Sequence, residues 1–259
     1  EKEKEKEKEK EKEKEKEKEK EKEKEKEKEK EKEKEALPLE PSEQELKEIQ
    51  KKSLEHLHTH LGSYFILNES EQGFLWAPAG TSASFVLCAG YPSPQSNPKA
   101  AWMTNLEGAC AGEKVPPPDV ALSRLQPDGG LNAALCLFDL KGGWLRFCCA
   151  NSKLYLVRKG ELKEFASDAL AAGASADSKF TLQTLGLRKG DCLYICMSAF
   201  DVQSPQETAL SNLLKALFLA NHTQALEQQQ ETIFKSLSGV SAIPGGPKDV
   251  LILGLRIGG

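Results

Sequence analysis

The sequence predicts a layered α+β domain, and three of its features support this prediction. Helical patterns with one apolar face stand near both ends of the folded part, strand patterns fill its middle, and an apolar strand closes the chain. The strand patterns are rich in aromatic and β-branched residues and are separated by polar or Gly-containing turns. Strands in groups with helices around them are typical of sheets whose outer faces are covered by helices.

Residues 1–35 are a strict alternation of Glu and Lys. Residues three apart in this repeat carry opposite charges, but residues four apart carry like charges, so any helix there is marginal. The repeat has no apolar side chain to bury, and it is interpreted as a spacer or tag, with a natural charged rod as the alternative. The chain is therefore divided into the repeat, a linker helix at 36–62 and a folded domain at 63–259.

The rest of the chain is weakly acidic. Of 259 residues 40 are acidic and 36 basic; without the 18 Glu and 17 Lys of the repeat, 22 acidic and 19 basic residues remain, a net charge of −3. No nucleic-acid partner is expected, because such proteins carry a basic excess. No apolar run is long enough for membrane insertion or for a signal peptide. We expect a cytoplasmic protein, and the initial Glu leaves room for a membrane tether in a missing N-terminal segment.

The cysteines and histidines are assigned no cofactor. The sequence has seven cysteines, an odd count without a CxxC pair, and most lie in apolar runs, so they are interpreted as buried thiols in a reducing compartment. His56 and His60 have the HxxxH spacing of half a zinc site, but no third ligand is apparent. A solvated helical surface is the preferred interpretation of these two histidines.

A helix is predicted over residues 42–61. Ser42 and Glu45 form an S-x-x-E capping box at its start. One face carries the apolar stripe Leu46, Ile49, Leu54, Leu57 and Leu61. A stripe of this kind has to pack against another surface.

The remaining elements follow from changes in hydrophobic period. Strands are predicted at 63–67, 73–77 and 84–89, and helices at 99–111 and 119–126. An antiparallel meander is predicted from 131 to 197, with Gly-containing turns between its strands. Ser204 and Glu207 form a second capping box, which opens the first of two helices before a last strand at 249–257.

Three stretches carry motifs of a known family. LNAALCLFDLKGGWLRFCCANS at 131–152, followed by KLYLVRKGELKEF, has the form F-x-T-x-x-x-x-x-L-D-x-x-x-G-x-L-x-x-x-x-A-G-H and a short strand with a turn Gly. GDCLYICMSAF at 190–200 has the form G-D-x-L-x-L-x-T-D-G-F, and KDVLILGLR at 248–256 the form D-D-x-T-L-L-V-L-R. With these motifs the chain resembles the RsbU/SpoIIE-type branch of the metal-dependent PPM serine/threonine phosphatases.

The resemblance implies both a fold and a chemistry. The family fold is a four-layer αββα sandwich of two mainly antiparallel sheets flanked by helices, which fits the order of elements predicted above. The family's reaction uses two divalent cations that bridge a water and lower its pKa, so that it attacks phosphorus. Several carboxylates have to hold these cations.

The expected carboxylates are replaced at the aligned positions. The early G-D-x-Y motif contains Ser63, the G-D-V-S-G loop contains Tyr91, the T-D-G motif contains Ser198, and the closing D-D pair begins with Lys248. An ammonium about 4 Å from a divalent ion opposes its binding by on the order of 8 kcal/mol at an effective dielectric of about 20. No metal site and no cofactor are therefore expected.

The prediction is a degenerate phosphatase domain, a pseudophosphatase that acts as a protein-interaction module in a bacterial signalling or envelope-associated assembly. The resemblance implies that the helix at 42–61 serves self-association or docking to an upstream segment. Residual acids are expected near the old site at Asp191, Asp201 and Asp249. Two alternatives stay open: an active metal-dependent protein serine phosphatase with ligands displaced to these acids, and a structural building block of a large multi-protein machine.

Overall fold

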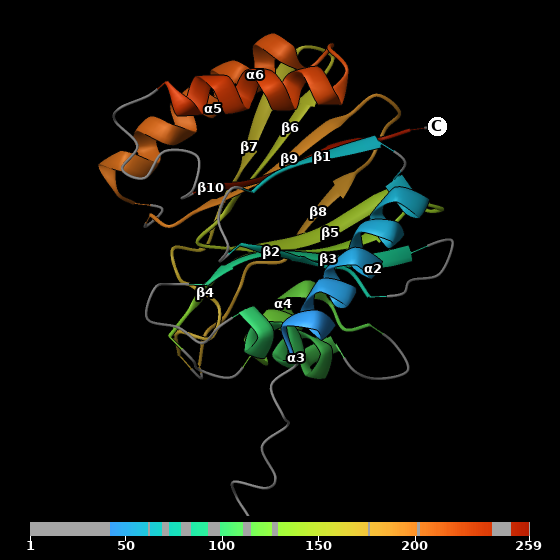
Figure 1. Ribbon diagram of the computed structural model, residues 1–259, viewed down its shortest axis with the longest axis vertical. Helices are drawn as coiled ribbons and strands as arrows, with labels where there is room; N and C mark the ends of the chain where they lie inside the picture. The colour runs from blue at the N-terminus through green and yellow to red at the C-terminus, as the bar shows by residue number, and fades with distance from the viewer. Residues whose placement is uncertain are drawn as a thin grey trace, which may run out of the picture. The chain divides into compact units, whose positions relative to one another are not determined.

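Two antiparallel sheets stack face to face in a computed structural model of the chain (Figure 1). The structure describes residues 42–61, 63–68, 73–78, 84–92, 99–110, 115–125, 129–175, 177–200, 203–239 and 250–258. Sheet 1 has the strand order β1 (Ser63–Asn68), β10 (Val250–Arg256), β9 (Cys192–Ser198), β6 (Lys153–Arg158) and β7 (Glu161–Phe165). Sheet 2 has the order β2 (Phe74–Trp76), β3 (Ser84–Pro92), β4 (Leu131–Asp139), β5 (Trp144–Ala150) and β8 (Gln183–Gly186).

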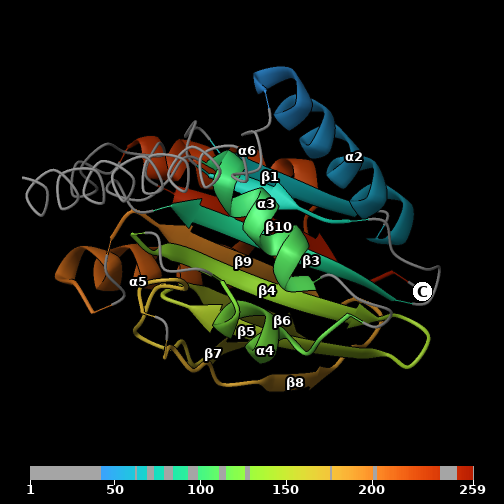
Figure 2. The same ribbon diagram turned by 90° about the horizontal axis from the view of Figure 1, so that it is seen from below.

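Helices cover the outer face of each sheet. The helices α5 (Pro205–Asn221) and α6 (Leu226–Ser238) pack on sheet 1, and α3 (Lys99–Cys110) and α4 (Pro118–Ser123) pack on sheet 2 (Figures 1 and 2). The α+β fold with a four-layer αββα sandwich is thereby confirmed. Three apolar clusters hold the layers together, one between the sheets and one beneath each pair of helices.

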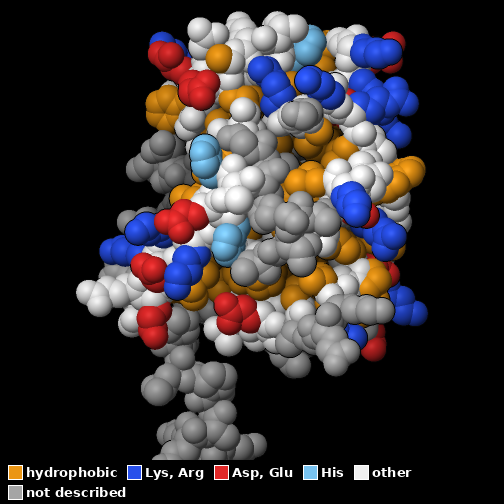
Figure 3. All heavy atoms as spheres, turned by 90° about the vertical axis from the view of Figure 1, so that its right-hand side faces the viewer, with side chains coloured by type: hydrophobic (Ala, Val, Ile, Leu, Met, Phe, Trp, Pro, Cys, Tyr) orange, Lys and Arg blue, Asp and Glu red, His pale blue; other side chains and the backbone are white. Residues whose placement is uncertain are grey.

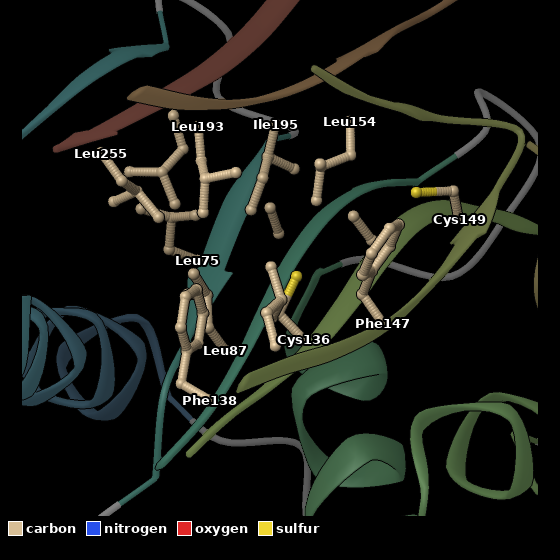
Figure 4. Packing of buried hydrophobic residues seen from close by; sticks show 14 of the residues in the cluster. Leu75, Leu87, Cys136, Phe138, Phe147, Cys149, Leu154, Leu193, Ile195 and Leu255 are labelled. Carbon is tan, nitrogen blue, oxygen red and sulfur yellow. The ribbon is translucent and has the colours of Figure 1, made fainter. Parts of the chain in front are cut away.

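The inter-sheet cluster follows from the alternation of side chains along the strands. In β9, Leu193 and Ile195 point toward sheet 2, whereas Tyr194 belongs to the cluster beneath α5 and α6. Leu87 and Phe138 meet the sheet 1 side chains from the opposite side (Figure 4). Because both faces of the central strands are covered, their sequences read as continuous apolar runs rather than as polar–apolar alternation.

The predicted meander is wrong, because the chain changes sheets in its middle. The strand β5 ends at Ala150 in sheet 2, and β6 begins at Lys153 in sheet 1. Asn151, between them, has a φ of 45°, a left-handed conformation that Asn adopts more readily than most residues. Strands buried on both faces have the same local pattern in either sheet, so the sequence could not show this change.

The helix α2 (Glu43–Leu61) lies along one side of the sandwich and contacts β1 and β2 (Figure 2). Its capping box is confirmed: Ser42 N–H donates to Glu45 Oε2 at 2.7 Å, and Glu45 N–H donates to Ser42 Oγ at 3.3 Å. Leu57 is fully buried in the inter-sheet cluster.

The apolar stripe of α2 packs on this domain itself. Leu46 and Ile49 pack partly buried against the sheet 2 cluster, and Leu54 does so against the inter-sheet cluster. The side chain of Leu61 lies outside the described residues. The expectation that this stripe contacts a partner is therefore wrong for Leu57, which has no exposed surface left to offer.

The helix and the sandwich belong to one compact unit, Pro41–Gly259. The other unit, Glu1–Glu40, includes the Glu-Lys repeat and lies outside the described residues. Among the helices of the described part, none has the length and apolar character needed to cross a membrane.

Candidate functional site

Two of the predicted site positions meet at one end of the sandwich, called here the Ser198 end. Tyr91 lies near the end of β3 and pairs with Asn132 of β4, and Ser198 is the last residue of β9. The side-chain amide of Asn132 donates to the backbone oxygen of Ser198 at 2.9 Å and so links sheet 2 to sheet 1. The structure thus brings these two positions together although 106 residues separate them in the sequence.

Ser63 does not reach this end. It begins β1 and pairs with Arg256, whereas the strand partner of Ser198 is Val250, at the other end of β10. The residue of β1 nearest the Ser198 end is Asn68, five positions farther along, which corresponds to roughly 16 Å of strand. The structure therefore separates Ser63 from Tyr91 and Ser198. Lys248 and Asp249 directly precede Val250 and, like Asp201, lie outside the described residues.

The side chain of Tyr91 lies in the inter-sheet core. It is 2% exposed and belongs to the cluster between the sheets. Along β3, Leu87 and Ala89 point to the same side as Tyr91, as the period of two along a strand requires. An aromatic ring thus fills space at one of the positions that the sequence analysis predicted to be a degenerate metal site.

The side chain of Ser198 points toward α5. Its Oγ donates to Glu207 Oε2 at 2.5 Å and accepts from the N–H of Phe200 at 3.2 Å. Lys153 of β6 lies 3.4 Å from Glu207 Oε1, and Glu207 is only 8% exposed. Burial raises the pKa of the Glu207 carboxyl, while the hydrogen bond from Ser198 and the charge of Lys153 oppose that rise.

Glu207 is a site residue that the sequence pattern misassigned. The cap itself is confirmed, because Glu207 N–H donates to Ser204 Oγ at 3.1 Å. The carboxylate, however, bonds Ser198 and Lys153 instead of completing the capping box. The S-x-x-E spacing describes the backbone bond correctly, but the direction of the carboxylate depends on a strand nine residues earlier in the chain.

Asn132 and Asn151 complete the polar part of the Ser198 end and were not singled out from the sequence. Asn151 Nδ2 donates to Asn132 Oδ1 at 2.8 Å, and Ser152 Oγ donates to the backbone oxygen of Ala133 at 2.7 Å. Asn132 is 6% exposed. The sequence did contain a signal for this role: Asn132 is a polar residue near the start of the apolar run LNAALCLF. A buried side-chain amide requires hydrogen-bond partners, so such a residue predicts a polar contact.

Asp191 lies at the opposite end of β9, immediately before its first residue, so the expectation that it lies near Ser198 is wrong. Arg158 donates two hydrogen bonds to its carboxylate, from Nε to Oδ1 at 2.8 Å and from Nη2 to Oδ2 at 2.6 Å. The backbone N–H of Arg188 also donates to Oδ2, at 2.8 Å. The hydrogen bond to Asp191 raises the pKa of Arg158. The bond from Arg188 N–H is local to the turn before β9, whereas the two bonds from Arg158 depend on β6 lying beside β9.

Solved structures with the same arrangement of elements are phosphatase domains. The SiaA-PP2C domain of Pseudomonas aeruginosa superposes with a TM-score of 0.60 at 16% identity, covering 82% of this chain and 96% of that domain. The chain has the PP2C-type phosphatase fold. The PP2C domain of SpoIIE from Bacillus subtilis, with a fragment of its regulatory domain, gives a TM-score of 0.55 at 12% identity, covering 75% of this chain and 63% of that one.

The RsbU and RsbW domains of a Mycobacterium tuberculosis protein also give a TM-score of 0.55, at 18% identity, covering 76% of this chain and 61% of that one. No protein-family profile and no curated protein match the sequence. The likeness at these identities shows the PP2C-type fold, and its Ser198 end has to be judged on its own side chains.

The described side chains at the Ser198 end do not fit a pair of divalent cations. Magnesium and calcium take several oxygen ligands, mostly carboxylates, carbonyls and waters. The one described carboxylate next to Ser198 is that of Glu207, which already accepts from Ser198 and faces Lys153. Within the described residues no group of three or more His, Cys, Asp or Glu is placed to hold a metal ion.

The histidine pair of α2 differs from its sequence interpretation. His56 is half-buried, and its Nδ1 lies 3.0 Å from the backbone oxygen of Ala77, the residue after β2. The N–H of Ala77 donates to Ser53 Oγ at 3.0 Å, so α2 satisfies both backbone groups of this residue. His56 thus attaches α2 to the sandwich rather than forming a solvated surface. The side chain of His60 lies outside the described residues.

Proposed function

We propose that this chain is a catalytically inactive, phosphatase-like protein-interaction module of a bacterial signalling or envelope-associated assembly. The observation that carries the proposal is the state of the Ser198 end. Tyr91 packs into the inter-sheet core, and Ser198 donates to a buried Glu207. A two-metal phosphatase needs carboxylates that face a hydrated site, because the metals have to bind and activate a water.

The contacts of Glu207 support inactivity further. To bind a metal, this carboxylate would have to leave the hydroxyl of Ser198 and the ammonium of Lys153. Among the described residues, Lys153 would then keep only its longer contact with Glu164 Oε1, at 3.9 Å. Breaking a buried ion pair costs several kcal/mol, on the order of 3–5. The pair of Glu207 and Lys153 therefore competes with any cation for the described carboxylate that contacts Ser198.

The rival proposal, an active phosphatase with displaced ligands, is less well supported. It needs Asp191, Asp201 and Asp249 near one another, but Asp191 is bound by Arg158 at the opposite end of β9. Asp201 and Asp249 lie outside the described residues. With Asp191 removed from the set, two acids would have to hold both metals.

Metal titration and a phosphatase assay test inactivity. The full chain is titrated with manganese and with magnesium by calorimetry, and hydrolysis of an aryl phosphate is followed with a PP2C-type phosphatase as positive control. We expect no stoichiometric heat and no turnover above the uncatalysed rate. Binding of two ions per chain, or turnover that a chelator abolishes, would overturn the proposal.

The partner surface of α2 is proposed to be its outer face, since the apolar stripe packs inward. This face borders a groove of about 550 Å³ lined by Lys47, Gln50, Lys51, Leu54, Glu55, His58, Thr59 and Tyr64. The groove carries charges of both signs, so a second copy related by a two-fold axis could place Lys51 of one chain against the Glu55 of the other. We propose self-association through this groove.

Solution mass tests the self-association. We expect a concentration-dependent dimer in sedimentation experiments, weakened by Lys51→Glu, with Lys179→Glu as a matched control of equal charge change away from α2. A ring or larger oligomer would instead favour the structural building block, and a monomer at all concentrations would refute the α2 contact.

A further inference from the structure

Cationic side chains gather at the end of the sandwich opposite Ser198, called here the basic end. Three turns meet there, joining β4 to β5, β6 to β7 and β8 to β9. The first and third turns are bonded directly, because Leu187 N–H donates to the backbone oxygen of Gly143 at 2.8 Å. The turns and the neighbouring β5 residue carry five bases: Lys141, Arg146, Lys159, Arg188 and Lys189. Four of the five are turn residues, and all five are exposed.

These cations are left without anionic partners inside the described part of the protein, where no ion pair involves any of the five. The acids of the same end are mostly engaged. Asp191 is held by Arg158. Two exposed acids lie beside the five bases: Asp139, whose Oδ1 accepts from the N–H of Gly142 at 2.7 Å, and Glu161 of β7. In a chain with a formal charge of −4, this local positive excess is a distinct feature.

An exposed tryptophan belongs to the basic end. Trp144, the first residue of β5, is 50% exposed, whereas Trp76 and Trp102 are buried. Its ring lies over Gly186 of β8, where an added Cβ would come within 3.5 Å of a ring carbon. Leu187, partly buried, continues the apolar surface toward the core.

Figure 3 shows Lys and Arg side chains beside exposed apolar surface on this side of the molecule. About half of Trp144 is exposed to water. A partner that covered it would gain roughly 25 cal/mol of binding free energy for each Å² of apolar area removed from water. An apolar centre with charged residues around it is the usual arrangement of a protein–protein interface.

We propose that the basic end docks an acidic protein segment that also carries aliphatic or aromatic side chains. Tryptophan and arginine are the residues most often found to dominate such interfaces. The apolar side chain of the partner would cover Trp144, and its carboxylates would meet Arg188 and Lys189. The surface differs from the α2 groove and does not depend on the lack of phosphatase activity.

A protein segment is favoured over the other anionic partners. A membrane surface would need a broader apolar face than one exposed tryptophan supplies. A single-stranded nucleic acid would need several exposed aromatic side chains in a row for its bases. Among the described residues of this end, Trp144 is exposed and Tyr64 is only partly so. Both partners are included as outcomes of the test.

The test uses the fluorescence of Trp144 in the full chain. Because the other two tryptophans are buried, acrylamide quenching reports chiefly on Trp144. The probe is a short synthetic peptide of Asp, Glu and Leu, which adds no fluorescence of its own. We expect saturable binding that protects the tryptophan from the quencher and that weakens as salt is raised.

Charge reversal at the basic end gives the comparison. Arg188→Glu with Lys189→Glu should weaken peptide binding by about tenfold or more, as expected for interface hot spots. The matched control, Lys179→Glu with Lys235→Glu, changes the net charge equally elsewhere and should bind within about twofold of the parent chain. Trp144→Ala, measured by calorimetry, should weaken the same peptide by about tenfold. Circular dichroism confirms folding, and Lys141→Gln replaces the double variant if that variant fails to fold.

Each of the other outcomes would overturn the proposal. An oligoglutamate of equal charge that binds as tightly as the Leu-containing peptide would reduce the site to unspecific charge attraction. Tighter binding of phosphatidylserine vesicles or of a single-stranded oligonucleotide, lost in the same variants, would assign the surface to those partners. Absence of peptide binding, or equal binding by the reversed and parent chains, would also refute it.

Discussion

Polar side chains are buried and hydrogen-bonded at the Ser198 end of the sandwich, whereas five cationic side chains are exposed at the basic end. At the Ser198 end, Asn132, Ser198 and Glu207 are buried and bond one another or the backbone across the two sheets. At the basic end, the turns expose cations such as Arg188 and Lys189 that make no ion pair with another described residue. The sequence resemblance predicted the site positions Tyr91 and Ser198 at the first of these ends. There the described polar groups bond one another, whereas these exposed cations at the opposite end do not.

This difference predicts which property depends on each end of the sandwich: stability or binding. Buried and satisfied polar groups add rigidity and cost free energy when they are broken, so changes at the Ser198 end should act on stability. Exposed charges contribute little to stability, so changes at the basic end should act on binding alone. Substitutions at the two ends can test this division.

Tyr91→Ala should give the largest loss. Removing a buried aromatic side chain leaves a cavity in the inter-sheet core, and we expect a loss of about 3–5 kcal/mol in the free energy of unfolding. Urea denaturation measures it. Tyr91→Phe keeps the ring and should cost much less. Equal stability of Tyr91→Ala and the parent chain would show that the ring does not fill the core.

Ser198→Ala should cost about 1.5–3 kcal/mol, because it removes a donor to a buried carboxylate. The same substitution should also raise the pKa of Glu207 further, since the hydrogen bond from Ser198 lowers it. Ser238→Ala, at an exposed helical serine, is the control and should stay within about 0.5 kcal/mol. A loss no larger than that of the control would contradict the bonding described for Ser198.

Glu207→Gln should change how stability depends on pH. Burial raises the folded-state pKa of Glu207 above its ordinary value of 4.5, so its folded form holds a proton that the unfolded form releases. Its contribution is therefore fully present below pH 4.5 and is lost as the pH rises through the raised pKa. Unfolding free energies from about pH 4 to 7 should thus show the parent chain losing stability relative to the variant. A constant difference would mean that the pKa is not raised.

Arg188→Glu with Lys189→Glu should have the smallest effect on stability, within about 0.5 kcal/mol, since neither side chain is buried or paired within the described residues. Thermal unfolding checks this at low and at moderate salt. A loss comparable to that of Ser198→Ala would show that the basic end, too, is an internal part of the fold.

Much of the fold could be predicted from local pattern. The helix at 42–61 was observed at Glu43–Leu61, with its capping box, because both signals depend on residues within one or two turns. The last strand, predicted at 249–257, was observed at Val250–Arg256. The motif resemblance supplied the layer order, which no single element contains.

The candidate site was predicted less well, because its contacts join distant segments. Tyr91 and Ser198 lie at the same end of the sandwich, but Ser63 lies at the other end of β1, and Asp191 at the other end of β9. A motif gives the position of a residue along a strand, whereas the strand's partner and register fix the end of the sheet to which that residue belongs.

Local patterns in the sequence predicted which residues are apolar on one face or on both and where the helices begin. The tertiary structure alone decided that β5 and β6 lie in different sheets, that Glu207 turns inward to Ser198, and that five cations share one end. The difference arises from how far apart in the sequence the interacting residues lie. Periodicity records burial over a few neighbouring residues, while the partner of a buried polar group and the charge of a surface are set by segments that meet only when the chain has folded.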